Sequence, residues 1–426
     1  MTNSPITPGR SWYEDSCGER PSYPSLKGER RCDVLIVGGG FCGLSAALNL
    51  ALAGVDVVLL EAHRVGDGAS GRNGGQMGSG QRESVLDTEA NLGFERAKAL
   101  WDMAEDAKRS LLETAQTHGF DAEYQPGQLT PMHRKRYEAE ARDEVETLNA
   151  RYGYKAIQWL DQPAMASALG SQHYFGGTRD GGTGHIHPMK YVIGLAKAAR
   201  ENGAALFEQS AVTKLERGQQ IVAHTALGVV RADRCLLALN GHHDDIRPEL
   251  ARHVMPIQSF IGATEPLGHN SPVLPGREAV DDSRFVVRYF RKTADNRLLF
   301  GGREAYGKAT PGDIRRTIGK QIAQIYPELS NIPLTHAWGG NVAITMPRNP
   351  YVRELKPGLW TAGGFSGHGV MLANYTGRMI AEVFLGKSDQ IKLFAQMKIP
   401  AFPGGAVLRN PLKVLALTWY AMLDRA

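Results

Sequence analysis

The sequence has few of the features that assign a protein to a specialised class. Its four cysteines form neither a C-x-x-C pair nor the spacing of a disulfide framework, so we expect a reducing, cytoplasmic environment. No apolar run reaches the length of a membrane-spanning helix. The polar, proline-rich residues 1–28 lack the apolar core of a signal peptide, and we expect no cleaved leader there.

The chain also lacks a strong excess of either charge, with 49 lysines and arginines against 44 aspartates and glutamates. The net charge of +5 forms no basic block with interleaved aromatic residues, which argues against nucleic-acid binding. The mean hydropathy of −0.30 is that of a soluble globular protein. Because 426 residues are too many for one compact core, we expect two domains.

What the sequence does contain is a complete β-α-β pattern near its start. Residues 34–37 form a short apolar run that breaks at G-G-G-F-C-G, residues 38–43, which fits G-x-G-x-x-G. Residues with helical period follow as far as Gly54, and a second apolar run, 55–60, ends on Glu61. This arrangement predicts a dinucleotide site, the alternative being an ordinary glycine turn in a buried β-α-β unit.

The residues of this pattern suit the chemistry of a dinucleotide. Gly38 permits a tight turn, Gly40 lets the backbone approach a pyrophosphate, and Gly43 lets the helix pack against the strand. The helix N-terminus then offers free N–H groups and a positive dipole end to the anion. Glu61 stands where a carboxylate can accept both hydroxyls of an unphosphorylated ribose. On this pattern alone, NAD is the simplest ligand.

Two further glycine-rich stretches indicate a larger cofactor. Residues 66–76, G-D-G-A-S-G-R-N-G-G-Q, lie where a longer dinucleotide would extend, and Arg72 could meet phosphate or flavin oxygens. A solvent-exposed turn is the alternative for this loop. Residues 363–369, G-G-F-S-G-H-G, lead from a strand into a helix whose N-terminus would stabilise a reduced flavin. His368 there excludes the nucleophile pattern G-x-S-x-G.

The remaining chain alternates between helical and strand-like segments. We interpret residues 1–31 as an extended arm and residues 175–188 as a glycine-rich turn region. The periodicity predicts helices over 83–118, 134–152, 162–169, 188–202, 314–325 and 372–384, and strands over 124–132, 204–207, 211–215, 221–225, 229–231, 234–239, 254–265, 284–290, 297–302, 335–345 and 358–364.

The three glycine motifs, in this order, resemble those of the D-amino-acid oxidase-like flavoproteins, within them the glycine oxidase and sarcosine oxidase branch. Further stretches look like bacterial gamma-glutamylputrescine oxidoreductases: GHIHP at 184–188, TADNRLLFGG at 293–302, WGGN at 338–341 and FPGG at 402–405. The likeness runs from about residue 33 to 405. It implies an FAD-dependent enzyme that oxidises a C–N bond.

The resemblance implies an α/β fold in which a Rossmann-like FAD-binding domain is interleaved with a substrate domain on an antiparallel sheet. We assign residues 1–90, 155–245 and 335–387 to the FAD-binding domain and residues 91–154 and 246–334 to the substrate domain. Residues 388–426 form a C-terminal extension. Its apolar helix, 408–423, is predicted to pack back on the domain, with contact to a membrane surface as the alternative.

The resemblance also implies which residues bind FAD. Relatives that attach flavin covalently use a cysteine near the strand before residue 363, and none occurs after Cys235, so we expect noncovalent FAD. The expected contacts are Gly38, Gly40, Phe41, Cys42, Gly43, Glu61, Ala62, Ala69, Ser70, Arg72, Asn73, Gly74, Gly75, Gln76, Val212 (through its backbone), Gly364, Ser366, Gly367, His368, Gly369 and Val370.

Two departures from the sarcosine oxidases bear on substrate and acceptor. Met371 stands where those enzymes place a lysine for the substrate carboxylate, which argues against a small N-methyl amino acid. A second lysine, credited with helping oxygen react, falls near Leu299, so oxygen or another electron acceptor remains open. A polyamine derivative such as gamma-glutamylputrescine is therefore the first substrate prediction. The alternative is a secondary or cyclic amino acid such as L-pipecolate or proline.

The reaction requires little acid–base machinery, since an amine with a free lone pair need only lie with its α-carbon over flavin N5. The candidates for the pocket wall are Tyr289, Arg303, Tyr306, Trp338 and His187. His185 and His187 could also be metal ligands, but no cysteine or carboxylate has a suitable spacing, and we expect no metal. A flavin-binding protein without turnover and an NAD dehydrogenase are the other two possibilities.

Overall fold

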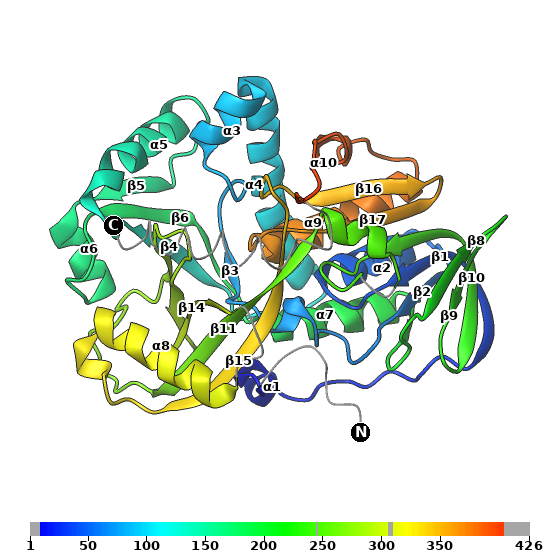
Figure 1. The fold of residues 1–426 in the computed structure, drawn as a ribbon, viewed down its shortest axis with the longest axis horizontal. Helices are drawn as coiled ribbons and strands as arrows, with labels where there is room; N and C mark the ends of the chain where they lie inside the picture. Colours follow the sequence, from blue (N-terminus) through cyan, green and yellow to red (C-terminus); the bar gives the residue numbers. More distant parts are fainter. Residues whose placement is uncertain (1–8, 244–245, 306–309, 404–426) are drawn as a thin grey trace.

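The computed structural model describes residues 9–243, 246–305 and 310–403, with only the backbone at 303–305 and 311. Two β-sheets lie at opposite ends of an elongated molecule, and helices pack between and around them (Figure 1). This arrangement confirms the predicted α/β class. Within the described residues, no helix combines the length and the apolar character needed to cross a membrane.

The first sheet is built around the β-α-β unit that the sequence predicts. Strand β1 pairs in parallel with β2 and β10, and β10 pairs in parallel with β17. The described part of this sheet has the order β16-β17-β10-β1-β2-β7, with β9 attached to β10 and β8 to β9. Its strands are β1 (Gly28–Val37), β2 (Val57–Leu60), β7 (Ala205–Phe207), β8 (Lys214–Arg217), β9 (Ile221–His224), β10 (Gly228–Leu237), β16 (Tyr351–Lys356) and β17 (Leu359–Gly363).

Both faces of this sheet are buried, which is why β1 is continuously apolar at its end. Val34 and Ile36 face one core, shared with α2 (Phe41–Leu52), α7 (Pro188–Glu201) and α9 (Gly369–Phe384). Leu35 and Val37 face a second core on the opposite side. The sheet thus holds the N-termini of α2 and α9, which follow directly on β1 and β17, at the carboxyl ends of parallel strands.

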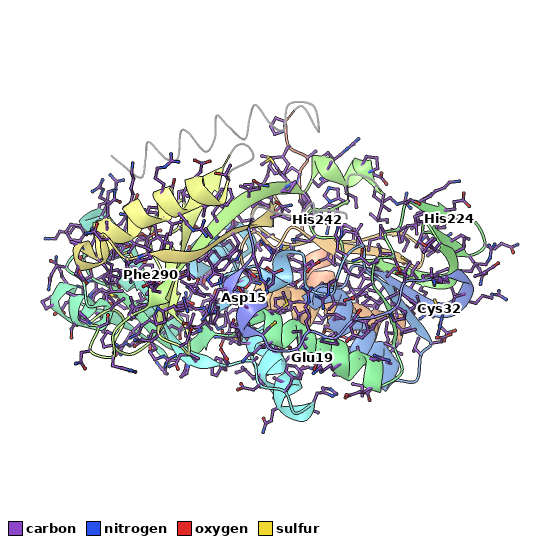
Figure 2. All side chains as sticks on the ribbon, turned by 90° about the horizontal axis from the view of Figure 1, so that it is seen from below. Asp15, Glu19, Cys32, His224, His242 and Phe290 are labelled. Atoms are coloured by element: carbon purple, nitrogen blue, oxygen red, sulfur yellow. The ribbon has the colours of Figure 1, made fainter. Side chains whose placement is uncertain are left out.

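The second sheet is mostly antiparallel and one of its faces is covered by α8 (Pro311–Ile325). Ile314, Ile318 and Ile322 of this helix pack on Phe290 and Phe300 of the sheet. Figure 2 shows Phe290 near one end of the molecule and Cys32 of the first sheet near the other. The described strands are β3 (Gln76–Met77), β4 (Gln125–Pro131), β5 (Ile157–Leu160), β6 (Gly177–His185), β11 (Met255–Pro266), β12 (Ala279–Asp281), β13 (Tyr289–Lys292), β14 (Arg297–Ala305) and β15 (Leu334–Ile344).

Several predicted segments differ from the structure. The helix predicted over 83–118 is two helices, α3 (Val85–Leu92) and α4 (Phe94–Thr117), because Gly93 with a φ of 78° ends the first. The arm over residues 1–31 contains α1 (Trp12–Ser16) and the start of β1. The other described α-helices, α5 (Glu138–Ala150), α6 (Gln162–Leu169) and α10 (Lys392–Ala395), include two at predicted positions. The apolar segment 408–423 lies outside the described residues.

The glycine-rich turn predicted over 175–188 is wrong, since β6 occupies most of it. The glycines there serve close approach between strands, because a Cβ on Gly177 or Gly184 would overlap the carbonyl of Thr130 or Gln125 on β4. The predicted strands 229–231 and 234–239 are one strand, β10, while β3, β5, β12 and β16 were not predicted. Val212 precedes β8 and does not open a strand.

The strand pairing can be compared with the predicted domain boundaries. Strands β5 and β6, at 157–185, and β15, at 334–344, pair within the second sheet, although our boundaries assign them to the FAD-binding domain. The division into two interleaved domains stays a prediction. At the level of strand pairing, each sheet is assembled from separated chain segments.

Gly377 sets how closely α9 can approach α2. A Cβ at this position would overlap the Cys42 carbonyl oxygen, so Gly377→Ala should lower the free energy of unfolding by about 1–3 kcal/mol. Gly319→Ala on α8 is the matched control, since no atom lies within 4 Å of its added Cβ, and it should stabilise by about 0.5–1 kcal/mol. Denaturant unfolding measures both. Equal effects of the two substitutions would contradict this account of the helix contact.

His187 is buried at the N-cap of α7. Its Nδ1 accepts from the Lys190 backbone N–H, and its Nε2 lies 3.0 Å from Ser16 Oγ. Burial, with a contribution from Arg291, lowers the pKa of His187 to about 3. The imidazole therefore binds a proton below about pH 6.5 in the unfolded chain but only near pH 3 in the folded chain. As a result, the folded state loses stability as the pH falls from about 6.5 towards 3.

The substitution His187→Asn keeps a capping side chain and removes this titration. Between pH 7 and pH 5 the wild type should lose about 2 kcal/mol more unfolding free energy than the variant. Urea unfolding at the two pH values tests this, with His269→Asn at an exposed position as the control that retains the loss. Identical pH dependence in H187N and the wild type would overturn the assignment.

Candidate active site

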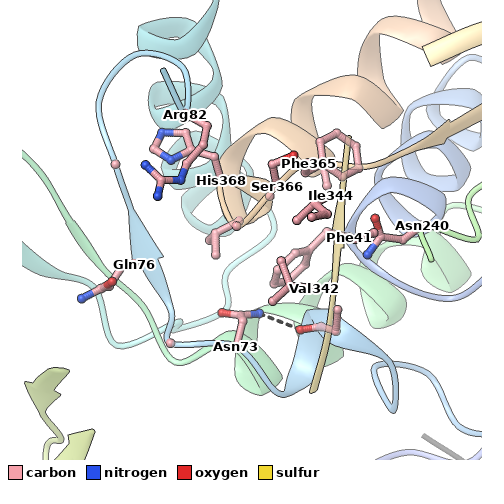
Figure 3. A pocket seen from close by; sticks show the side chains of 18 of the residues that line it. Phe41, Asn73, Gln76, Arg82, Asn240, Val342, Ile344, Phe365, Ser366 and His368 are labelled. Atoms are coloured by element: carbon pink, nitrogen blue, oxygen red, sulfur yellow. Dashed lines mark hydrogen bonds between the residues drawn. The ribbon is translucent and has the colours of Figure 1, made fainter. Parts of the chain in front are cut away.

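A cavity of about 890 Å³ is lined by residues of both sheets and of the helices between them. Part of its wall consists of the N-terminal residues of α2 and α9, seen close up in Figure 3. Neither N-cap residue caps its helix with its side chain, and in the first turn of α2 the Phe41 N–H is bound by Ser70, so the other backbone N–H groups of both first turns are available to a ligand. Two positive helix ends at one cavity fit an anionic cofactor with two separated polar parts.

At the α2 end, close backbone packing shapes the wall. Gly38 has a φ of 111°, and a Cβ there would lie 2.6 Å from the Ala238 carbonyl oxygen. Gly43 does not line the cavity, because it packs against the Gly38 carbonyl instead. The backbone N–H of Phe41 donates to Ser70 Oγ at 3.0 Å, which joins the helix to the loop at 66–76.

Glu61 reaches the same end of the cavity from β2. Its Oε2 accepts the Gly39 N–H at 2.7 Å and its Oε1 accepts the His63 N–H at 2.9 Å. Burial raises the pKa of this carboxyl, and the two backbone N–H groups act in the opposite direction. The carboxylate is thus held at the turn after β1, where it remains part of the cavity wall.

The loop at 66–76 is organised by its own side chains. Asn73 donates to the Ala69 and Ser70 carbonyls and accepts from the Gly75 N–H. The prediction for Arg72 was incomplete. Its guanidinium donates to the carbonyls of Gly339 and Gly9, so it fastens the loop to β15 and to the N-terminal segment, although the residue borders the cavity.

At the α9 end, β17 leads into a sharp turn. Ser366 has a φ of 52°, and its hydroxyl donates to the Gly364 carbonyl and accepts from the Thr345 N–H. His368 is the N-cap residue of α9 and lies beside Arg82 (Figure 3). Burial, with a contribution from Arg82, lowers the pKa of His368 to about 4, so its imidazole is neutral at pH 7.

Most predicted cofactor contacts border this one cavity. Gly43 and Gly364 are the exceptions: Gly43 packs against the Gly38 carbonyl, and Gly364 has a φ of 69° and lies close to the Thr345 side chain. The predicted residues that line the cavity are Gly38, Gly40, Phe41, Cys42, Glu61, Ala62, Ala69, Ser70, Arg72, Asn73, Gly74, Gly75, Gln76, Val212, Ser366, Gly367, His368, Gly369 and Val370.

The candidates for the substrate wall are placed differently from one another. Tyr289 lines the cavity, with its ring against Gly74 and its hydroxyl 3.1 Å from Ser259 Oγ. Trp338 is fully buried beside Tyr13, and its indole N–H donates to the Arg72 carbonyl. It does not border the cavity, and neither does His187. Arg303 is described in its backbone only, and Tyr306 lies outside the described residues.

His185 and His187, the two candidate metal ligands, have other contacts. His185 Nε2 lies 3.2 Å from the Arg277 carbonyl oxygen, and His187 caps α7. Over the described ranges, no three histidine, cysteine, aspartate or glutamate side chains stand where they could share a metal ion.

The sequence prediction missed a polar wall contributed by the second sheet. Gln128 and Thr130 of β4 pair with Asp180 and Thr178 of β6, and Asp281 of β12 adjoins them. All five line the cavity. The alternation of Gln128, Leu129 and Thr130 was a usable signal, since it places two polar side chains on one face of a strand.

Comparisons with known proteins identify the family of the chain. Residues 33–383 match the family described as DAO, FAD dependent oxidoreductase. The chain is 55% identical over 423 residues to "Probable oxidoreductase OrdL" of Rhizobium meliloti (strain 1021), covering 99% of each. It is 35% identical over 418 residues to gamma-glutamylputrescine oxidoreductase of Escherichia coli (strain K12), covering 97% of this chain and 98% of that protein.

The fold is also similar to that of a solved structure. The crystal structure of glycine oxidase from Geobacillus kaustophilus superposes with a TM-score of 0.72 at 21% identity, covering 87% of this chain and 99% of that one. The chain therefore belongs to the DAO family of FAD-dependent oxidoreductases, and it is an enzyme that oxidises amine-type substrates with FAD as its cofactor.

Proposed function

We propose that this enzyme oxidises a polyamine derivative, gamma-glutamylputrescine or a close analogue. The observation that carries the proposal is the cavity in which two open helix N-termini meet a polar wall containing two carboxylates. Carboxylates suit a substrate that carries positive charge. The identity of 35% to an enzyme named for gamma-glutamylputrescine, over nearly the whole of both chains, supports the same substrate class.

We further propose that FAD lies along the cavity with its pyrophosphate at α2 and its ring towards α9. Gly38, Gly40 and Glu61 would then hold the adenosine end, and the first turn of α9 would face the polar edge of the ring. Cys42 borders the cavity, but burial raises the pKa of its thiol to about 12. With Cys235 the last cysteine in the sequence, the proposal includes noncovalent attachment.

When bound, FAD supplies an acceptor for the hydride that leaves the carbon next to the amine nitrogen. The nitrogen also loses a proton, and water then hydrolyses the imine to an aldehyde and ammonia. The chain contributes a partly desolvated cavity, which favours the neutral amine that this reaction needs. His368, neutral at pH 7, adds no positive charge beside the reacting amine. Oxygen or another acceptor then reoxidises the enzyme.

Anaerobic mixing tests the substrate directly. Gamma-glutamylputrescine should bleach the visible absorbance of the oxidised flavin rapidly, and L-pipecolate, proline and sarcosine should do so slowly or not at all. Rapid bleaching by one of these amino acids alone would replace the proposed substrate by the alternative class. A yellow protein that none of these amines bleaches would overturn the proposed substrate class.

The role of Glu61 can be separated from its effect on folding. Glu61→Gln should raise the Kd of FAD about tenfold or more, because a carboxylate accepts both ribose hydroxyls more strongly than an amide. Glu208→Gln is the matched control, since Glu208 is also buried and accepts two backbone N–H groups but lies outside the cavity. Flavin fluorescence titration measures both. Similar increases of Kd in the two variants would refute the assignment.

A further inference from the structure

On β4, β6 and β12, the face of the second sheet that points into the molecule is polar. Directly paired residues on neighbouring strands project to the same side, and here Gln128 pairs with Asp180 and Thr130 with Thr178. The intervening Leu129 points to the opposite face and is fully buried in the core beneath α8. Buried polar groups are costly unless they find partners, so a polar inward face indicates a polar ligand.

Within this wall, Gln128 and Asp281 have hydrogen-bonding capacity left over. Asp281 Oδ1 accepts both from Gln128 Nε2, at 2.7 Å, and from Thr130 Oγ1, at 2.8 Å. In the described part of the chain, no hydrogen-bond donor is assigned to Asp281 Oδ2. Gln128 is only 8% exposed, and its Oε1 has no hydrogen-bond partner among the described residues. The wall therefore contains two acceptor oxygens with capacity left over, Oδ2 of Asp281 and Oε1 of Gln128.

Asp180 of the same wall is satisfied in a different way. It accepts from the Ser79 and Tyr154 hydroxyls and from the Gly182 N–H. Ser79 in turn accepts from the buried ammonium of Lys108 at 2.7 Å. Asp180 is thus already paired within the protein, which leaves Asp281 as the wall carboxylate with capacity for a ligand.

We propose that Asp281 and the amide oxygen of Gln128 bind a second, non-reacting ammonium group of the substrate and so select amines that carry an additional positive charge. An ammonium has three donors and no acceptor, which matches this set of acceptors. Burial raises the pKa of the Asp281 carboxyl, and the hydrogen bonds from Thr130 and Gln128 and the charge of Arg82, which also lines the cavity, act in the opposite direction. This inference rests on the proposed function, because it concerns the recognition of that amine substrate.

The test compares ligands that differ in one ammonium. Gamma-glutamylputrescine and glutarylputrescine, which has hydrogen in place of the α-ammonium, serve for flavin reduction. A second pair, 1,4-diaminobutane and 1-aminopentane, differs in carrying an ammonium or a methyl group at one end and serves for calorimetric binding to the holoenzyme. In Asp281→Asn, kcat/KM and affinity should fall about 10- to 100-fold for the ligand with the extra ammonium and should change little for its partner. Asp281→Glu keeps the charge and should recover part of the loss.

Two further variants keep the result interpretable. Asp282→Asn replaces the neighbouring buried aspartate, which does not line the cavity. For each ligand pair, the ratio of the value measured with the extra ammonium to the value measured without it should stay as in the wild type. Gln128→Leu keeps the carboxylate and removes the amide oxygen, and should lower the ratio even where D281N does not fold. Unchanged ratios in D281N and Q128L overturn the proposal.

The binding arm also separates this inference from the proposed function. If gamma-glutamylputrescine fails to reduce the flavin while the preference for diaminobutane still depends on Asp281, the proposed substrate is wrong and the ammonium site stands. If gamma-glutamylputrescine reduces the flavin but neither ratio responds to Asp281 or Gln128, the substrate stands and the ammonium site is wrong.

Discussion

The contact between α2 and α9 is the constraint on which the site depends. Gly377 brings the axis of α9 so close to α2 that a single added carbon would overlap the Cys42 carbonyl oxygen. Because the helices follow directly on β1 and β17 of one sheet, this contact brings their first turns to a common cavity. Two helix ends separated by a wider gap could not both serve one cofactor.

The second sheet supplies polar side chains to the cavity from one of its faces, which the first sheet does not. The first sheet is apolar on both faces, so the polar groups on its side of the site lie at turns, as backbone N–H groups and the Glu61 carboxylate. The second sheet is apolar beneath α8, and its opposite face is apolar beside α1 but carries hydroxyl, amide and carboxylate groups to the cavity at β4, β6 and β12. The division of labour in our account follows from this difference: one side holds the cofactor and the other recognises the amine.

The sequence was informative where a local pattern has one structural solution. The turn after β1, the acid after β2 and the turn into α9 were all predicted at the correct places, since glycine spacing, helix start and strand end constrain one another. The helices α6 and α7 were predicted almost to the residue, because each begins with a proline in its first turn.

The sequence was misleading where glycine serves packing between distant segments. The sequence of strand β6 predicts a turn because it is rich in glycine. These glycines are needed for close contact with carbonyl groups of β4, which lie about 50 residues earlier in the chain. The polar wall was missed for a related reason, since Asp281, Gln128 and Asp180 come together only through strand pairing. Trp338 and His187, chosen as pocket residues by position, instead pack around the N-terminal helix α1.

The most direct test of this account is a crystal structure of the holoenzyme with 1,4-diaminobutane bound under anaerobic conditions. The account predicts electron density for FAD between the first turns of α2 and α9, with one ammonium of the diamine against Asp281 and Gln128. Density that places the flavin ring away from α9, or the diamine away from the polar wall of the second sheet, would contradict it.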